Sequence, residues 1–375
     1  MPTPSTIYLD HAATGQMPPE VLAAMNLYYT NFQANVHRSS NEISNRATSE
    51  FENARTKIAE FLGVKGHQIC FTSGATMGLN ILALSLEKTL TVNDTIVLSR
   101  LEHHSNLLPW VAVAKRVGCS INWLEVDENG TFIAESIEKA INENTKVVAV
   151  THASNVTGEI LPIEKIIARA KKVGAITIVD GAQSAMHLPI NLAALECDAF
   201  VCSAHKMGGP TGIGILFLSL NLQKIISPLF WGGGMIGEVK NGEAPALPFP
   251  YGFEAGTQNI AGAIGMGAVV DYLKNIGWEK IQTAEKDILE YTTTQLESVE
   301  GLKIIGPKSL LKTPVVSFYF TNVASEDIGN FLGQSHIAVR IGVMCASMLF
   351  EQMPMTSAIR ASFNFTTKKR KLMNW

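Results

Sequence analysis

The residue whose type and surroundings most clearly predict chemistry is Lys206, which lies in a glycine-rich segment between two apolar runs. The runs at 199–202 and 213–218 predict a strand, a tight loop and a second strand. A lysine held between apolar strands is partly desolvated, which lowers the pKa of its amine and makes it a better nucleophile. The alternative interpretation of Lys206 alone is a solvated surface lysine in a glycine turn.

Asp180 gives this lysine a partner. It ends the apolar run AITIVD at 175–180 and is followed by Gly-Ala-Gln. The carboxyl ends of parallel strands are where open α/β sheets bind ligands. Pyridoxal phosphate requires a carboxylate against its pyridinium nitrogen and a lysine that holds it covalently. Asp180 and Lys206 therefore predict a pyridoxal phosphate site.

The elements that must position this pair alternate between strand and helix patterns. Segments 68–72, 95–99 and 146–152 read as strands, and segments 19–31, 49–62 and 163–173 read as helices. This alternation predicts an α/β fold with a mostly parallel sheet. A proline- and glycine-rich loop at 228–250 ends the series.

A smaller α+β unit follows the loop. The predicted elements are helices at 260–276, 278–299 and 325–334 and strands at 302–305 and 315–320. We therefore expect a large cofactor-binding domain at 15–255, and a small domain formed by 1–14 and 256–375.

Composition excludes several classes of protein. The 30 basic and 33 acidic side chains nearly balance, so nothing indicates nucleic-acid or membrane-surface binding. Neither a signal peptide nor a run long enough to span a bilayer is visible. The five scattered cysteines predict neither a disulfide framework nor a zinc ribbon, and a reducing, cytoplasmic location fits them. The adjacent His103 and His104 lack a third ligand at metal-binding spacing.

Short motifs along the chain give a family resemblance. They are IYLDHAAT, ANVHRSS, EHHSNLLPW, SNVTG, VDGAQ, SAHK, FEAGTQN and AVRIGVMCA. In this order they resemble the class V aminotransferase family of pyridoxal phosphate enzymes, and within it the cysteine desulfurases of the SufS type (group II). The resemblance extends from Tyr8 to Ser362.

The resemblance implies a fold-type I homodimer with active sites at the subunit interface. The implied reaction converts L-cysteine to L-alanine and leaves the sulfur as a persulfide on Cys345. It also implies a sulfur-acceptor protein, iron–sulfur cluster assembly as the process served, and L-selenocysteine as a second substrate.

The same resemblance assigns roles to individual residues. Lys206, Cys345 and His103 are implied as catalytic, with His103 also stacking on the pyridoxal ring. Residues implied to bind the cofactor are Thr76, His103, Asn155, Asp180, Gln183, Ser203, His205, Lys206 and Thr257. Residues implied to bind the substrate are Asn155, Arg340, Arg360 and His37. The loop of His37 and the hydroxyl of Thr257 are implied to reach the site of the other subunit, and a buried inert thiol is the alternative for Cys345.

Four positions depart from the family pattern. Ser39 replaces a glycine, Met77 replaces a glutamate, and Val343 and Met344 replace paired histidines before Cys345. We expect slower turnover with an unchanged product. The alternatives are a selenocysteine lyase, another class V aminotransferase or epimerase, and a degenerate inactive member of the family.

The end of the sequence, TTKKRKLMNW from Thr366, is basic and fits nothing before it. A single nucleotide inserted after the codon of Phe365 allows the same letters to encode YNKKEEIDEL, which resembles the family. We therefore expect a frameshift near Phe365 and the loss of the final helix; a natural basic tail is the alternative.

Overall fold

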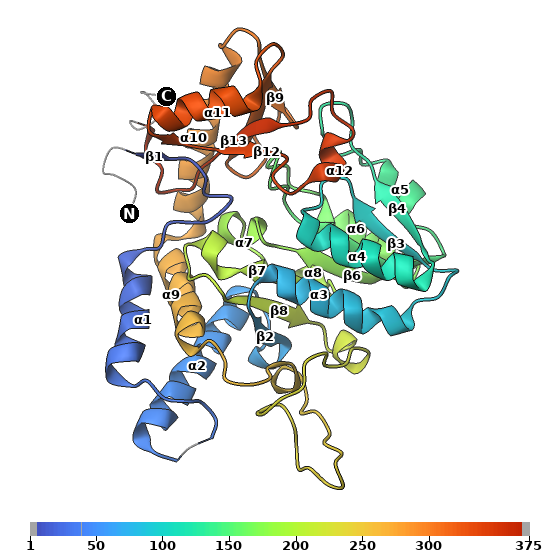
Figure 1. Ribbon diagram of the computed structural model, residues 1–375, viewed down its shortest axis with the longest axis vertical. Helices are drawn as coiled ribbons and strands as arrows, with labels where there is room; N and C mark the ends of the chain where they lie inside the picture. Colours follow the sequence, from blue (N-terminus) through green and yellow to red (C-terminus); the bar gives the residue numbers. More distant parts are fainter. Residues whose placement is uncertain (1–5, 39, 370–375) are drawn as a thin grey trace.

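A seven-stranded sheet forms the centre of the larger part of the molecule (Figure 1). The computed structural model describes residues 6–38 and 40–369. The strand order is β2-β8-β7-β6-β5-β3-β4. In this sheet β8 runs antiparallel to both of its neighbours, while β7, β6, β5, β3 and β4 run parallel, which confirms the predicted mostly parallel α/β sheet. The bounds are β2 (Ile69–Thr72), β3 (Thr95–Ser99), β4 (Ser120–Leu124), β5 (Thr145–Thr151), β6 (Ile176–Asp180), β7 (Ala199–Ser203) and β8 (Gly214–Leu218).

Both faces of this sheet are covered, because successive strand residues point to opposite sides. Along β3, Val97 belongs to one apolar core, whereas Ile96 and Leu98 belong to the other. Helices α3 and α4 cover the second face, and α2, α6 and α9 cover the first. Burial on both faces explains why these strands are continuous apolar runs.

The helices of this part begin near the predicted positions, with one exception. Helix α2 begins at Glu42, well before the predicted start at Ser49, because the side chain of Asn41 caps it by accepting a 2.9 Å hydrogen bond from the N–H of Ser44. The bounds are α1 (Pro19–Asn31), α2 (Glu42–Phe61), α3 (Ala75–Leu86), α4 (His104–Val117), α5 (Ser136–Ala140), α6 (Ile163–Lys172), α7 (Ser184–His187) and α8 (Leu192–Leu195).

A four-stranded antiparallel sheet, in the order β12-β13-β10-β9, forms the smaller part at the top of Figure 1. A two-stranded parallel sheet joins β1 to β11 beside it, so the first strand of the described chain packs with the smaller part. The bounds are β1 (Ile7–Tyr8), β9 (Leu302–Ile305), β10 (Val315–Phe320), α11 (Ser325–Gln334), β11 (Ile337–Ala338), β12 (Arg340–Gly342), α12 (Ser347–Phe350) and β13 (Ala358–Ser362).

Two long helices connect the parts: α9 (Ile260–Ile276) and α10 (Trp278–Glu297). The apolar face of α9 lies in the core that α1 and α2 share, whereas Ile288 and Leu289 of α10 lie in the core of the small sheet. Gly277 separates the helices with a positive φ of 83°. We therefore propose that the domain boundary lies near Gly277, later in the chain than position 256.

Two expectations fall partly or wholly outside the described residues. Ser39, which replaces the glycine of the family pattern, lies outside the described residues, and so do residues 370–375 of the basic tail. The frameshift near Phe365 stays a prediction. Before that point, Asn364 accepts hydrogen bonds from the backbone N–H and hydroxyl of Thr366.

Candidate functional site

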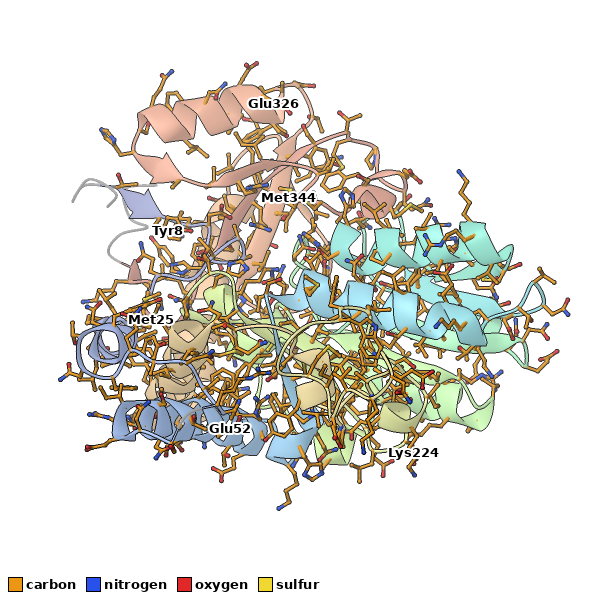
Figure 2. The ribbon with its side chains drawn as sticks, turned by 60° about the horizontal axis from the view of Figure 1, so that its bottom comes forward. Tyr8, Met25, Glu52, Lys224, Glu326 and Met344 are labelled. Carbon is orange, nitrogen blue, oxygen red and sulfur yellow. The ribbon has the colours of Figure 1, made fainter. Side chains whose placement is uncertain are left out.

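A single pocket between the two domains collects most of the residues singled out from the sequence. Helix η3 (Ala204–Met207) supplies part of its wall, and residues of β6, β12 and β13 supply others. The predicted residues that line it are Thr76, His103, Asn155, Asp180, Ser203, His205, Lys206, Arg340, Cys345 and Arg360. Met344, which also lines it, lies where the small domain meets the large one (Figure 2).

Lys206 lies in the tight loop between β7 and β8, as the sequence predicts. The backbone N–H of Ala204 donates to Ile213, and that of Gly209 donates to Ala204. Burial lowers the pKa of the Lys206 amine, although the nearby carboxylate of Asp180 opposes this effect. A larger fraction of this amine is therefore neutral and nucleophilic than for a solvated lysine.

Asp180 is the last residue of β6 and is buried. Its Oδ1 accepts a 2.9 Å hydrogen bond from the N–H of Ala182. Burial raises the pKa of the carboxyl, and the positive charge of Lys206 opposes this effect. The next residue, Gly181, lies against the ring of Phe200, where an added Cβ would come within 1.9 Å of the ring, so this position requires glycine.

The amino end of α3 provides a site for an anion. Gly74 precedes it with a φ of 150°, a conformation that favours glycine. Free amides at a helix N-terminus attract phosphate. Ser203 accepts from the N–H of Ala75, and the hydroxyls of Thr76 and Ser105 lie 2.7 Å apart, so hydroxyl groups surround this end of the pocket.

His103 caps α4, because its Nδ1 accepts a hydrogen bond of 3.1 Å from the N–H of Ser105. The proton of the neutral imidazole therefore lies on Nε2. Burial, together with the positive charge of Lys206, lowers the pKa of His103 to about 4. The ring is neutral near pH 7.

Cys345 lies on a loop held in an unusual backbone conformation. Met344 and Cys345 have φ angles of 47° and 57°, in the left-handed region that few non-glycine residues adopt. The carbonyl oxygen of Cys345 accepts a 2.7 Å hydrogen bond from the N–H of His104, and the side chain of Asn155 donates one of 2.8 Å to the carbonyl of Met344. These bonds fix the thiol at the pocket.

Two arginines converge from neighbouring strands, since Arg340 of β12 pairs directly with Arg360 of β13. Arg360 is 3% exposed and donates to Asp10 (2.6 Å) and to the carbonyl of Asn155 (3.0 Å). Its buried Nε has no hydrogen-bond partner among the described residues. Two guanidinium groups with an unsatisfied donor suit a carboxylate ligand.

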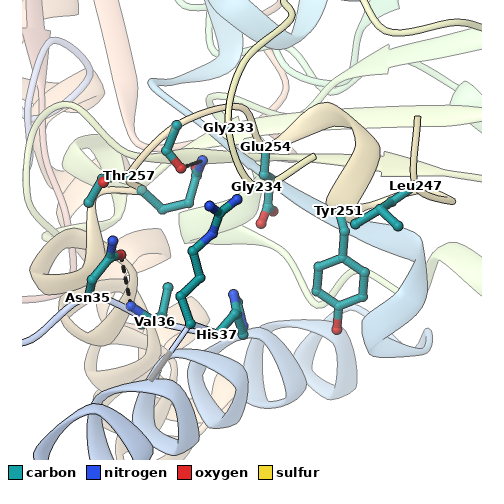
Figure 3. A pocket seen from close by; sticks show the side chains of 12 residues that line it. Asn35, Val36, His37, Gly233, Gly234, Leu247, Tyr251, Glu254 and Thr257 are labelled. Atoms are coloured by element: carbon teal, nitrogen blue, oxygen red, sulfur yellow. Dashed lines mark hydrogen bonds between the residues drawn. The ribbon is translucent and has the colours of Figure 1, made fainter. Parts of the chain in front are cut away.

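Three predicted residues lie outside this pocket. Gln183 is buried, and its amide donates to the carbonyl of Ala12. His37 and Thr257 line a second pocket, which Asn35, Tyr251 and Glu254 help to form (Figure 3).

A buried network next to the second pocket escaped the sequence analysis. Arg55 of α2 makes two hydrogen bonds to Glu254, of 2.6 and 2.9 Å, and also bonds Glu52. Glu52 in turn contacts His37 at 2.9 Å. Burial opposes the change, but the hydrogen bonds of His37 and Arg55 lower the pKa of Glu52 to about 2. The sequence did contain one signal of this network, because Arg55 interrupts the otherwise apolar helix face that carries Phe51 and Ile58.

The residues of the first pocket fit pyridoxal phosphate. Asp180 suits the ring nitrogen, Lys206 suits the covalent bond, and the start of α3 with Thr76 suits the phosphate. When bound, this cofactor withdraws electrons from the bonds around the α-carbon of an amino acid. No group of metal-ligating side chains and no helix able to cross a membrane occur among the described residues.

Comparisons with known proteins agree with this fit. A probable cysteine desulfurase from Halalkalibacterium halodurans is 41% identical over 360 residues, covering 95% of this chain and 88% of its own. The apo structure of a cysteine desulfurase from Thermococcus onnurineus superposes with a TM-score of 0.95 at 36% identity, covering 98% of this chain and 92% of that chain. The cysteine desulfurase CsdA of Escherichia coli gives 0.91 at 30% identity, covering 99% and 92%.

A family description, aminotransferase class V, matches residues 7–373 of the chain. This match covers nearly the whole sequence, including every residue that lines the pocket of Lys206. The chain therefore belongs to the class V aminotransferase family.

Proposed function

We propose that this protein is a pyridoxal phosphate-dependent cysteine desulfurase that converts L-cysteine to L-alanine. The observation that supports this proposal most strongly is that a thiol, Cys345, lines the same pocket as Lys206 and Arg360. Other class V reactions on amino acids use an amine and a carboxylate-binding group, whereas sulfur transfer also requires a nucleophile that accepts the sulfur.

In this proposal the arginines orient the substrate. The carboxylate of L-cysteine binds between Arg360 and Arg340, which directs its thiol toward the loop of Cys345. Asp10 holds Arg360 in place through a partly buried 2.6 Å ion pair. Orientation of the two sulfur atoms supplies much of the rate advantage, because it replaces a bimolecular encounter.

The chain's own groups move the protons. Lys206, whose pKa is lowered by burial, removes the proton from the α-carbon and returns protons to carbon. His103 is neutral near pH 7, with its proton on Nε2, and exchanges a proton with the departing sulfur. The paired histidines expected beside Cys345 are absent, since Val343 and Met344 occupy those positions.

The sulfur transfer balances without an external oxidant. The Cβ–S bond of the substrate breaks and an S–S bond to Cys345 forms. L-cysteine and the Cys345 thiol thus become L-alanine and the Cys345 persulfide. A thiol-bearing acceptor protein in the cytoplasm then removes the outer sulfur, and iron–sulfur cluster assembly is the process that we propose it serves.

We further propose that the active enzyme is a homodimer. His37 and Thr257 line a pocket separate from that of Lys206 within one chain, which leaves them available to a second subunit. Large apolar side chains are exposed nearby, including Phe230, Trp231 and Tyr251. Mixing a Lys206→Ala chain with a Thr257→Ala chain should restore activity in part, and a fully active monomer would contradict the dimer.

The test of the function is alanine release from L-cysteine, followed with and without a thiol reductant. The expected result is one turnover without reductant, as the persulfide accumulates, and repeated turnover with it. Alanine formed from L-selenocysteine alone would identify a selenocysteine lyase instead, and transfer of the amino group to an oxo acid would identify an aminotransferase.

A further inference from the structure

A third cavity, of about 470 Å³, lies where the two domains meet on another side of the molecule. The turn at 127–131 supplies one wall, the carboxyl end of α10 a second, and the segment 302–312 a third. The N–H of Gly306 donates a 2.7 Å hydrogen bond to the carbonyl of Asn129, which joins two of these walls. Its volume falls in the range of small-molecule sites.

The side chain that distinguishes this cavity is Lys312. The residue is only 8% exposed, and its amine has no hydrogen bond or ion pair within the part of the chain that the structure describes. Burial lowers the pKa of Lys312 to about 8, against the attraction of Glu159 and Glu297, so the amine is still charged at pH 7. A charged amine on a nearly buried side chain, with no direct hydrogen bond or ion pair, favours a ligand that brings an anionic oxygen to it.

An unpaired hydroxyl lies beside the same cavity. The Oγ1 of Thr293 is buried and lacks a hydrogen-bond partner among residues 6–38 and 40–369. Thr293 precedes Glu297 by one turn of α10, so the two side chains share a helix face. Buried unsatisfied polar groups are rare in native proteins and each one requires an explanation.

We propose that this cavity binds a small free amino acid. Its carboxylate would bind the ammonium of Lys312 and the hydroxyl of Thr293, and its ammonium would bind the exposed carboxylate of Glu297. The lining residues Leu302, Ile304 and Leu310 offer apolar surface to a short side chain. The lining holds two carboxylates, Asp127 and Glu297, and a second lysine, Lys308, so a ligand that carries both charges matches it better than a simple anion does.

Equilibrium dialysis of radiolabelled L-alanine against the holoenzyme tests this proposal. We expect Lys312→Met to bind one molecule of L-alanine fewer per chain than the parent. Any L-alanine bound in the pocket of Lys206 is the same in both proteins and does not affect this difference. Lys303→Met changes an exposed lysine of β9 that does not line the cavity, and it should bind as the parent does. Equal binding by the parent and Lys312→Met would overturn the proposal.

A second variant protects the test against misfolding. Glu297→Gln changes an exposed residue, and it should weaken the same binding event at least tenfold by removing the partner of the ligand's ammonium. Competition distinguishes the ligand class: glycine should displace the label, whereas propionate should not. Displacement by propionate as strong as by glycine would show a simple anion site and contradict the assignment.

Discussion

The backbone N–H of His104 donates a 2.7 Å hydrogen bond to the carbonyl oxygen of Cys345, so the turn that positions His103 is joined directly to the loop that carries the thiol. A second contact strengthens this link. The Nε2 of His104 accepts a hydrogen bond from the backbone N–H of Ser347 and lies 2.9 Å from the hydroxyl of the same serine. The large domain thereby holds the thiol loop of the small domain.

This link predicts the effect of Ser347→Ala. Loss of one hydrogen bond of about 1 kcal/mol should loosen the Cys345 loop and lower kcat roughly fivefold, with cofactor binding unchanged. Ser335→Ala removes an exposed hydroxyl far from this loop in the sequence and serves as the control. Equal kcat values for both variants would show that the contact does not position the thiol.

Lys206→Ala should abolish covalent attachment of the cofactor, because no other described lysine lines the pocket that holds Asp180. Borohydride reduction followed by peptide mapping should label Lys206 in the parent and no lysine in the variant. Lys224→Ala, at an exposed position marked in Figure 2, should leave the label in place. A pyridoxyl group on a different lysine of the parent would refute the assignment.

Asp180→Asn should retain cofactor and lose at least a hundredfold in turnover, since a neutral amide cannot keep the pyridinium nitrogen protonated. The measurement is kcat together with the cofactor content of the purified variant. Turnover at the level of the parent would show that Asp180 does not contact the ring nitrogen.

The lowered pKa of His103 predicts a loss of stability in acid. The folded protein binds this proton only near pH 4, whereas the unfolded chain binds it near pH 6.5, so stability falls as pH falls between these values. From pH 7 to pH 5 this group should cost about 2 kcal/mol. Denaturant unfolding at both pH values measures it.

His103→Asn is the matched variant, because asparagine also caps helices and does not titrate. It should lose less stability than the parent between pH 7 and pH 5. His152, whose pKa burial also lowers to about 4, contributes equally to both proteins and cancels. The same acid sensitivity in both proteins would contradict the assignment to His103.

The sequence predicted those features that local patterns determine. The run ending at Asp180 and the turn around Lys206 are contiguous in the chain, and their apolar residues and glycines specify the strands and the loop directly. The motif resemblance placed Arg340 and Arg360 together, and the register of β12 and β13 pairs them.

Features that depend on distant contacts were not predictable. The contact of His104 with Ser347 joins residues 243 apart in the chain, and nothing near either residue indicates the other. The left-handed conformation of Cys345 is disfavoured locally for a non-glycine residue, and the hydrogen bonds that hold this loop come from the distant residues His104 and Asn155. The position of Lys312 in a cavity between the domains was likewise not predictable, because residues far apart in the sequence form its walls.

The most direct test of the proposed function is the mass of the peptide that holds Cys345 after one turnover of L-cysteine without reductant. The account predicts a gain of one sulfur atom on Cys345 and none on Cys70, Cys197 or Cys202, which are buried in the cores. Cys345→Ser should bind cofactor and substrate but release no alanine from L-cysteine, because a hydroxyl does not accept the sulfur. Alanine release by Cys345→Ser at the rate of the parent would contradict the account.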